Sequence, residues 1–410
     1  MSTFTIGNEK YDWKLKSPYK MNRLTAFFAV LLMFVIASCK EPMAVLTDRV
    51  FREARMRYVE MDKAIDEYSM PRSFVDGRFI QCKKNNWVSG FYPGTLWYIY
   101  EYTGDNAIRI LADKHTRRLD SLYYMRTHHD IGFQTQASYL NGYRLTGNSE
   151  YLPFIERNAS KLAARFSDVT GCIKSWDSEE WDYPVIIDNM MNLEHLMVAS
   201  KLFDADSLAD IACTHANTTM RNHFRPDFTT YHLLDYSSET GQVRKKQTYQ
   251  GAADESAWAR GQAWALYGYA MMAEKSSDRK AFSAYLLQAE KVAEMLLEKL
   301  PEDGIPYWDF DSENIPDEYK DASAAAVMAS GFSTVSRITE KGRLSRECRH
   351  MAETQIRTLA SEKYLAEAGT NGNFLLMHSV GNYPFSVEVD APLTYADYYF
   401  LEALIKFRSL

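Results

Sequence analysis

One stretch of the sequence decides the fold: Ala257-Trp-Ala-Arg-Gly-Gln-Ala-Trp-Ala-Leu-Tyr-Gly-Tyr-Ala270. Small and aromatic residues occupy every face of this predicted helix, so it is expected to be buried on all sides. The next predicted helix, 279–299, has an apolar stripe that includes Phe282 and Leu286, and charged residues on its other face. Helices of these two kinds alternate along the chain. This alternation favours an inner ring of buried helices wrapped by an outer ring of amphipathic ones.

Helical spacing of apolar residues continues from about residue 45 to the end of the chain, and strand-like segments occur only near 171–176 and 229–234. Turns such as Thr103-Gly104-Asp105 recur between helices and are typical of a helix stop followed by a new N-cap. We therefore expect an all-α fold of six helical hairpins, an (α/α)6 barrel, with an open superhelix of hairpins as the alternative. The predicted helices are 46–68, 92–102, 106–125, 132–145, 149–166, 186–202, 205–223, 255–273, 279–299, 321–337, 343–360 and 391–408.

The composition limits the classes of function that this protein can have. The 410 residues are 46% hydrophobic and carry a net charge of −7, which argues against nucleic-acid binding because phosphate contacts need a basic surface. The chain holds 27 Tyr, 21 Phe and 8 Trp. Such an aromatic excess is explained either by a bulky core or by platforms for flat ligands such as sugars.

The N-terminal region has the sequence features of a leader peptide. Basic Arg23 precedes an apolar run over 24–36, which is too short for an ordinary membrane span and suits a secretion signal. Ile36-Ala-Ser-Cys39 resembles the lipobox of bacterial lipoproteins, in which the cysteine is lipidated; a plain signal peptide is the alternative. We expect residues 1–38 to be the leader, with the true start at Met21, and 39–410 to be a single catalytic domain. The protein would be exported and held at the outer membrane through Cys39 alone.

Removal of this leader makes the chain more acidic. Residues 1–38 carry five Lys or Arg and two acidic residues, so the remainder has a net charge near −10. The other four cysteines are widely spaced and form no CxxC or Cys/His pattern, so buried thiols are favoured over a metal or redox site. These four are Cys82, Cys172, Cys213 and Cys348.

Long irregular segments separate the hairpins, and loops of this length in a compact domain are usually functional. They lie at 69–91, 167–185, 224–254, 300–320 and 361–390. Tryptophan, histidine and amide side chains concentrate in them, namely Trp87, Trp176, Trp181, His232, Gln250, Trp308 and His378.

Two carboxylates at predicted helix starts are candidates for acid and base chemistry. Asp130 precedes Ile-Gly-Phe133, and Asp188 follows an apolar segment. Either could simply cap a helix N-terminus. Burial near a second carboxylate would raise the pKa of Asp188, whereas the helix N-terminus would lower it, so the sequence leaves the net shift open. The adjacent His128 and His129 would point apart, which argues against a metal site.

Arg260 lies between Trp258 and Trp264 in the stretch quoted first. A guanidinium between indoles is suited to holding a carboxylate on a flat ring. The alternative is an arginine paired with a core acid beneath packed tryptophans.

Four motifs follow one another along the chain: His129-Asp130-x-Gly132-Phe133, Asp188-Asn-Met-Met-Asn192, Trp258-Ala-Arg-Gly-Gln-Ala-Trp264 and Asp390-x-Pro-Leu-x-Tyr395-x-Asp397-Tyr-Tyr399. Together they resemble the unsaturated glucuronyl hydrolases, glycoside hydrolase family 88, from about Trp87 to the C-terminus. The sister family that acts on unsaturated rhamnogalacturonan fragments is the alternative, although Asn-Gly is expected there in place of Gln262-Ala263.

The resemblance implies that Asp188 is the general acid and base and that Asp130 assists it, with no cofactor and no metal. It implies a pocket for an unsaturated uronyl oligosaccharide, lined by Trp87, His129, Trp176, His232, Gln250, Trp258, Arg260, Trp264 and His378. Met377 stands where relatives are expected to have tyrosine. The resemblance thus implies release of a 4,5-unsaturated uronic acid from lyase-generated, glycosaminoglycan-type fragments. A non-catalytic glycan-binding lipoprotein and an ordinary (α/α)6 glycosidase are the competing functions.

Overall fold

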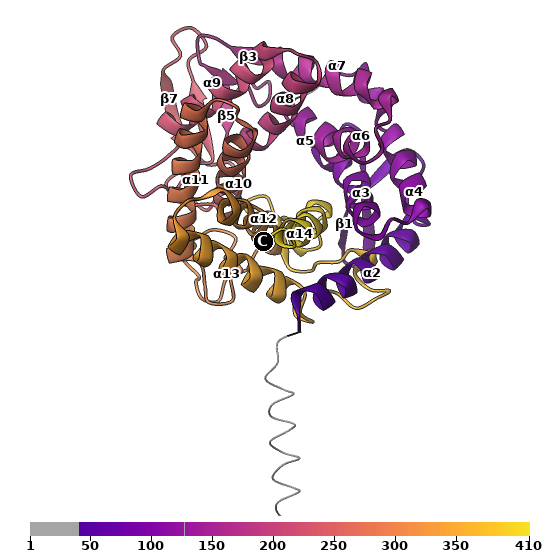
Figure 1. Cartoon of the computed structure of the whole chain (residues 1–410). Helices are drawn as coiled ribbons and strands as arrows, with labels where there is room; N and C mark the ends of the chain where they lie inside the picture. Colours follow the sequence, from indigo (N-terminus) through magenta and orange to yellow (C-terminus); the bar gives the residue numbers. More distant parts are fainter. Residues whose placement is uncertain (1–40, 127) are drawn as a thin grey trace, which may run out of the picture. The chain divides into compact units, whose positions relative to one another are not determined.

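The computed structural model describes residues 41–126 and 128–410, and Leu46–Leu410 form one compact unit. The predicted leader and Cys39 lie outside the described residues. All twelve predicted helices are present, and the unit is an (α/α)6 barrel (Figure 1). Within the described part of the chain, no helix is long and apolar enough to cross a membrane.

The inner ring consists of helices that are buried around most of their circumference. They are α3 (Phe91–Thr103), α5 (Ile131–Thr135) with the π-helical turn η3 (Gln136–Leu140) and α6 (Asn141–Thr146), α8 (Asn189–Leu202), α10 (Ala259–Lys275), α12 (Ala322–Ile338) and α14 (Thr394–Phe407). Each packs on the next, and α14 packs on α3, which closes the ring. Every residue of α10 from Ala259 to Ala273 is buried, as its sequence predicts. The open superhelix is thereby excluded.

The outer helices bury one face each. They are α2 (Met43–Asp62), α4 (Asn106–Arg117), α7 (Leu152–Ala163), α9 (Asp206–Asn222), α11 (Arg279–Lys299) and α13 (Gly342–Leu359). Each precedes its inner partner in the chain, so the barrel is built from six outer-to-inner hairpins. Short 3₁₀ turns η1, η2, η4 and η5 cover Trp87–Gly90, Asp120–Tyr123, Ser149–Tyr151 and Asn371–Asn373.

Strands are more numerous than the sequence pattern indicates. The segments predicted near 171–176 and 229–234 overlap β4 (Cys172–Ile173) and β6 (Leu233–Tyr236), and β4 pairs with β3 (Phe166–Ser167). The others are β1 (Ser69–Val75) with β2 (Arg78–Lys83), β5 (Tyr183–Ile186) and β7 (Val243–Gln247) on either side of β6, and β8 (Ser379–Asn382) with β9 (Val387–Ala391).

Several predicted helix ends were therefore wrong. Residues 63–68 leave the helix for a turn before β1, and 186 ends strand β5. Helix α10 starts at Ala259 rather than 255 because Trp258 is extended and bridges to Asp309. Strand β5 escaped prediction because all four of its residues are buried, so it shows no alternation of polar and apolar residues.

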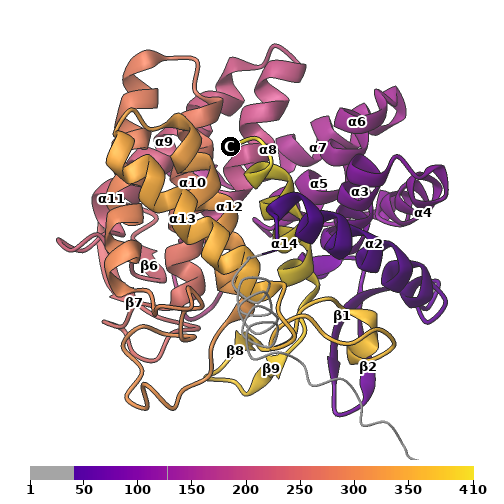
Figure 2. The same ribbon diagram turned by 60° about the horizontal axis from the view of Figure 1, so that its bottom comes forward.

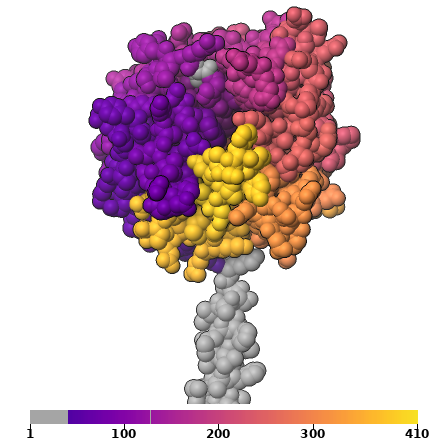
Figure 3. Space-filling view, turned by 180° about the vertical axis from the view of Figure 1, so that it is seen from behind, coloured from indigo at the N-terminus to yellow at the C-terminus, as the bar shows by residue number. Residues whose placement is uncertain are grey.

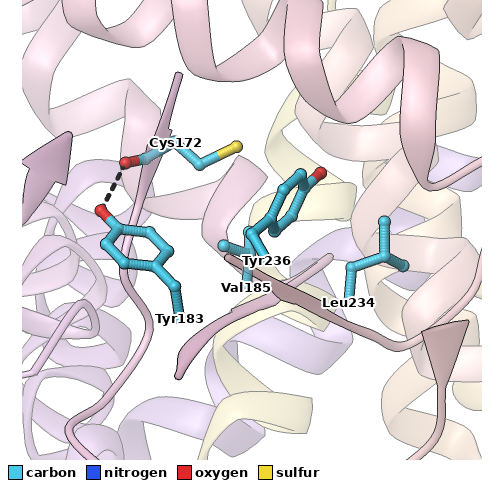
Figure 4. Close-up of a cluster of buried hydrophobic side chains, with 5 residues drawn as sticks. All are labelled: Cys172, Tyr183, Val185, Leu234 and Tyr236. Carbon is cyan, nitrogen blue, oxygen red and sulfur yellow. Dashed lines mark hydrogen bonds between the residues drawn. The ribbon is translucent and has the colours of Figure 1, made fainter. Parts of the chain in front are cut away.

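The sheet formed by β5, β6 and β7 has its own small core (Figure 4), made of Cys172, Tyr183, Val185, Leu234 and Tyr236. The Tyr183 hydroxyl donates to the Cys172 carbonyl oxygen at 2.8 Å. This core anchors β5, the strand that leads directly to Asp188. The four described cysteines are free thiols, as expected, and burial raises the pKa of Cys82, Cys172 and Cys348 to about 12.

The hairpins and loops gather at one end of the ring. Figure 2 shows β1, β2 and β6 to β9 together at this end. The inner helices α3, α8 and α10 begin there, because each follows one of the long loops, and the start of α5 packs against the start of α8. The space-filling view is hollowed where the indigo and magenta segments meet the yellow C-terminal segment (Figure 3).

Candidate active site

A pocket of about 160 Å³ at this end brings together eight of the predicted site residues. It is lined by Trp87, His129, Asp130, Trp176, Ile186, Asp188, His232, Tyr249, Gln250 and Arg260. These residues come from segments that are far apart in the sequence. The long irregular loops carry half of this lining, namely Trp87, Trp176, His232, Tyr249 and Gln250.

Asp188 occupies the N-cap position of α8, yet its side chain accepts no capping hydrogen bond. The side chain is 13% exposed, and its Oδ2 atom is buried without a hydrogen-bond partner in the described chain. Burial, together with the negative charge of Asp130, raises the pKa of Asp188 to about 7, although the Arg260 charge and the Trp264 indole oppose the shift. Asp188 is thus held as an acid that can carry a proton near neutral pH.

Asp130 stands at the start of α5 and likewise makes no side-chain cap. Its Oδ2 lies 3.0 Å from His128 Nδ1, and its Oδ1 lies 3.3 Å from His129 Nε2. Burial alone would raise the pKa of Asp130, but His129, His128 and Asn192 outweigh it and hold the pKa below its usual value. The two carboxylates are therefore differentiated: Asp130 loses its proton at a lower pH than Asp188 does.

The close contact between α5 and α8 holds Asp130 in place. The backbone N–H of Phe133 donates to Asn192 Oδ1 at 2.7 Å. A Cβ at Gly132 would lie only 2.5 Å from the same oxygen, so only glycine allows this approach. Asn189 bonds the His129 ring from the same helix. The Asn189 and Asn192 positions were visible in the sequence motif, but their role depends on this contact between helices.

The hydrogen bonds around His232 define its tautomer. Its Nδ1 accepts from the backbone N–H groups of Tyr249 at 2.9 Å and Gln250 at 3.1 Å. Burial lowers the pKa of His232 to about 3, so the ring is neutral and its hydrogen is on Nε2. That Nε2 lies 3.7 Å from Asp188 Oδ2 and has no hydrogen-bond partner in the described chain. The Nε2 hydrogen of His232 and the carboxyl group of Asp188 thus face the same point of the pocket.

Arg260 is paired inside the protein. Its Nη1 lies 2.9 Å from Asp321 Oδ2 and also bonds the Val380 carbonyl, while its Nη2 donates to the Gly381 carbonyl at 2.5 Å. The guanidinium is 4.5 Å from the Trp258 ring centroid. The structure therefore has the core-acid arrangement rather than a free carboxylate clamp. Arg260 still lines the pocket and contributes positive charge to it.

Three predicted pocket residues do not line the pocket. Trp258 packs behind His232 at a centroid distance of 4.7 Å, and Trp264 is fully buried. Trp264 acts through Asp188, whose pKa its indole lowers. The His378 side chain is 41% exposed and lies 2.6 Å from Asp390, outside the lining. The family resemblance had implied these positions, but burial and loop direction separate them from the lining.

The model of Glycosyl Hydrolase Family 88 matches residues 62–406. The chain belongs to glycosyl hydrolase family 88. It is therefore a glycoside hydrolase, as the four motifs predicted.

Family 88 members with curated functions are similar over most of the chain. An unsaturated glucuronyl hydrolase of Formosa agariphila is 41% identical over 330 residues, 79% of this chain and 80% of its own. An unsaturated chondroitin disaccharide hydrolase of Streptococcus pneumoniae is 29% identical over 96% of both chains. The crystal structure of an unsaturated glucuronyl hydrolase specific for heparin matches with a TM-score of 0.85 and 42% identity, covering 89% of this chain and 97% of that chain.

A larger cavity of about 450 Å³ lies among the C-terminal halves of the inner helices of this family 88 enzyme. Its acids are engaged: Glu402 accepts from Tyr98 at 2.8 Å and Tyr267 at 3.0 Å, and Glu194 lies 3.3 Å from Lys275. The smaller pocket instead contains an unpartnered acid oxygen. The smaller pocket is therefore the candidate active site, despite its size.

Two lining residues of this family 88 chain, Ile186 and Tyr249, were not among the predicted site residues. Ile186 ends strand β5, and Tyr249 is the polar one of the two. Tyr249 precedes Gln250 in the predicted functional loop, and it is 41% exposed at the rim. The signal available was its place beside a predicted pocket residue. Because the sequence holds 27 tyrosines, residue type alone gave no reason to select Tyr249.

Proposed function

We propose that this enzyme releases 4,5-unsaturated uronic acid from the non-reducing end of lyase-generated oligosaccharides, with Asp188 as acid and base and Asp130 assisting. One observation carries the assignment of the acid: a buried carboxyl with a pKa of about 7 and an unpartnered oxygen, beside an ionised carboxylate. Family membership supports the reaction class.

The chemistry follows from the substrate. The unsaturated ring is an enol ether whose C4=C5 bond is conjugated to its carboxylate. Asp188 donates its proton to C4, and the resulting carboxylate accepts a proton from the water that adds at C5. The C5 hemiketal opens by breaking the bond to the ring oxygen, which leaves a C1 hemiacetal that expels the leaving sugar as an alcohol. One water is consumed, and Asp188 ends as it began.

The pocket suits this substrate. Trp87 and Trp176 offer indole faces for a planar ring, and Arg260 supplies positive charge for the uronate. Neutral His232 directs its Nε2 hydrogen to the side of Asp188, where an incoming oxygen would be held. In a chain with a negative total charge, this local cation is what favours an anionic sugar.

Glycosaminoglycan fragments are the substrate class we propose, because relatives are named for heparin and for chondroitin disaccharides. Membership of family 88 favours this reaction over that of the rhamnogalacturonan family and over non-catalytic glycan binding.

Turnover should remove the ultraviolet absorbance of the conjugated C4=C5 bond. We expect absorbance loss with unsaturated glycosaminoglycan disaccharides and release of the second sugar in equal amount. The saturated disaccharide of the same linkage is the control and should not be cleaved. Cleavage of both would instead indicate direct attack at the anomeric carbon, as in an ordinary glycosidase.

We also propose that the chain is exported and anchored by a lipid on Cys39, supported by the basic start, the short apolar run and the lipobox-like sequence. Labelled palmitate supplied to bacteria expressing the full chain should be incorporated into the protein and found in the outer membrane. Cys39→Ser should abolish the label. Equal label in both proteins would contradict the proposal.

A further inference from the structure

An aromatic cluster continues outward from the pocket. Tyr249 lies at its centre, with ring centroids 5.9 Å from Trp176, 5.8 Å from Trp181 and 5.1 Å from Phe385. Trp176 and Tyr249 line the pocket, whereas Phe385 is 54% exposed outside it. We call Tyr249 and Phe385 the rim platform. The two rings lie 136 positions apart in the sequence, so only the fold brings them together.

Backbone and side-chain hydrogen bonds hold the platform in position. The Tyr249 N–H donates to His232 at 2.9 Å, which ties the platform to the acid site. Gln250 Nε2 donates to the Gly381 carbonyl at 3.2 Å, joining the loop of Tyr249 to strand β8. Phe385 follows β8 in a tight turn closed by the Ser386 N–H, which donates to the Tyr383 carbonyl at 2.9 Å. The platform is thus braced to the pocket on both sides.

The character of the platform indicates its ligand. Exposed apolar rings that border a pocket are favourable for binding, because covering them removes apolar surface from water. Among residues 41–126 and 128–410, no lysine or arginine stacks on either ring. The platform therefore offers flat apolar faces without positive charge. The C–H face of a sugar ring fits such a surface.

We propose that the rim platform binds the leaving sugar, the residue joined to the unsaturated uronic acid, through its C–H face. This inference rests on the proposed function, because that reaction places the unsaturated ring against Asp188 and directs the leaving sugar toward the rim. The platform thereby selects substrates whose leaving group is a sugar ring over those with a small alcohol.

Two substrates distinguish an effect on the rim platform from an effect on the catalytic pocket. They are an unsaturated disaccharide and the methyl glycoside of the same unsaturated uronic acid. Tyr249→Ala and Phe385→Ala should each raise KM for the disaccharide about fivefold, in line with the loss of one stacking contact. The kcat should stay within about twofold, because the bonds that change are in the unsaturated ring. The methyl glycoside should show wild-type KM with Phe385→Ala, because Phe385 lies outside the pocket lining.

Controls distinguish stacking from general damage. Tyr249→Phe keeps the ring and should retain wild-type KM. Leu287→Ala removes an apolar side chain that is 53% exposed on outer helix α11, and it should change neither substrate's kinetics. Equal KM increases for the disaccharide and the methyl glycoside with Phe385→Ala, or no increase for either substrate, would contradict the proposal that the rim platform binds the leaving sugar. If the wild-type enzyme consumes neither unsaturated substrate, the proposed function itself fails, and this outcome is visible before any variant is compared.

Discussion

Asp188→Asn is expected to reduce kcat about 1,000-fold, within the range that general acid and base catalysis supplies. The amide has nearly the shape of the carboxyl but cannot deliver a proton to C4. It also leaves Trp87, Trp176 and Arg260 in place. Substrate binding should therefore be retained, with a dissociation constant within about threefold of wild type. The measurements are absorbance loss for turnover and calorimetry for binding.

The outcome that contradicts this assignment is retention of more than about a tenth of wild-type activity, since no general acid would then have been removed. Reaction of the wild-type enzyme in heavy water gives an independent check. Deuterium should appear at C4 of the released uronic acid, because Asp188 exchanges its proton with solvent before donating it. Its absence from C4 would count against protonation at that carbon.

A raised pKa alone does not identify the acid. Burial also raises the pKa of Asp397, to about 6. Its two oxygens, however, accept hydrogen bonds from the Leu375 and Leu376 N–H groups at 2.8 and 2.9 Å and from the Tyr58 hydroxyl at 2.9 Å. Asp397 is thus a structural acid that fixes the loop before β8. Asp188 differs because one of its oxygens has no such partner and the residue lines the pocket.

Asp130→Asn is expected to lower kcat at neutral pH about 100-fold and to move the pH profile. The active form needs a protonated Asp188, so the rate falls as pH rises through the pKa of that group, about 7 in the wild type. The negative charge of Asp130 raises this pKa, and its removal lowers it. The alkaline limb should therefore shift to lower pH. The measurement is kcat from about pH 4 to about pH 9, which spans the titration of carboxyl and imidazole groups.

A charge control accompanies this variant. Glu340→Gln removes one negative charge from an exposed turn between α12 and α13, and it should leave both kcat and the alkaline limb unchanged. If Asp130→Asn lowers kcat while the limb stays in place, Asp130 positions the substrate but does not tune Asp188. If the limb moves to higher pH, the assigned roles of the two carboxylates are wrong.

Much of the site could be predicted because the motifs place chemistry beside helix starts. Asp130 and Asp188 each precede an inner helix, and the loops before those helices open toward one end of the barrel. Trp258, Trp264 and His378 lie outside the pocket lining for a physical reason. The family resemblance implied a place for Trp264 in the pocket, but it does not show that other side chains cover this residue.

The sequence by itself determined the double ring and singled out Asp130 and Asp188 as the candidate acids. Helix burial follows from residue type at a period of about 3.6, and that pattern is local. Only the tertiary structure decided that the pKa of Asp188 is raised, that Arg260 is paired with Asp321 and that Tyr249 meets Phe385. A pKa, an ion pair and a ring contact depend on groups distant in sequence, and their distances are set by packing.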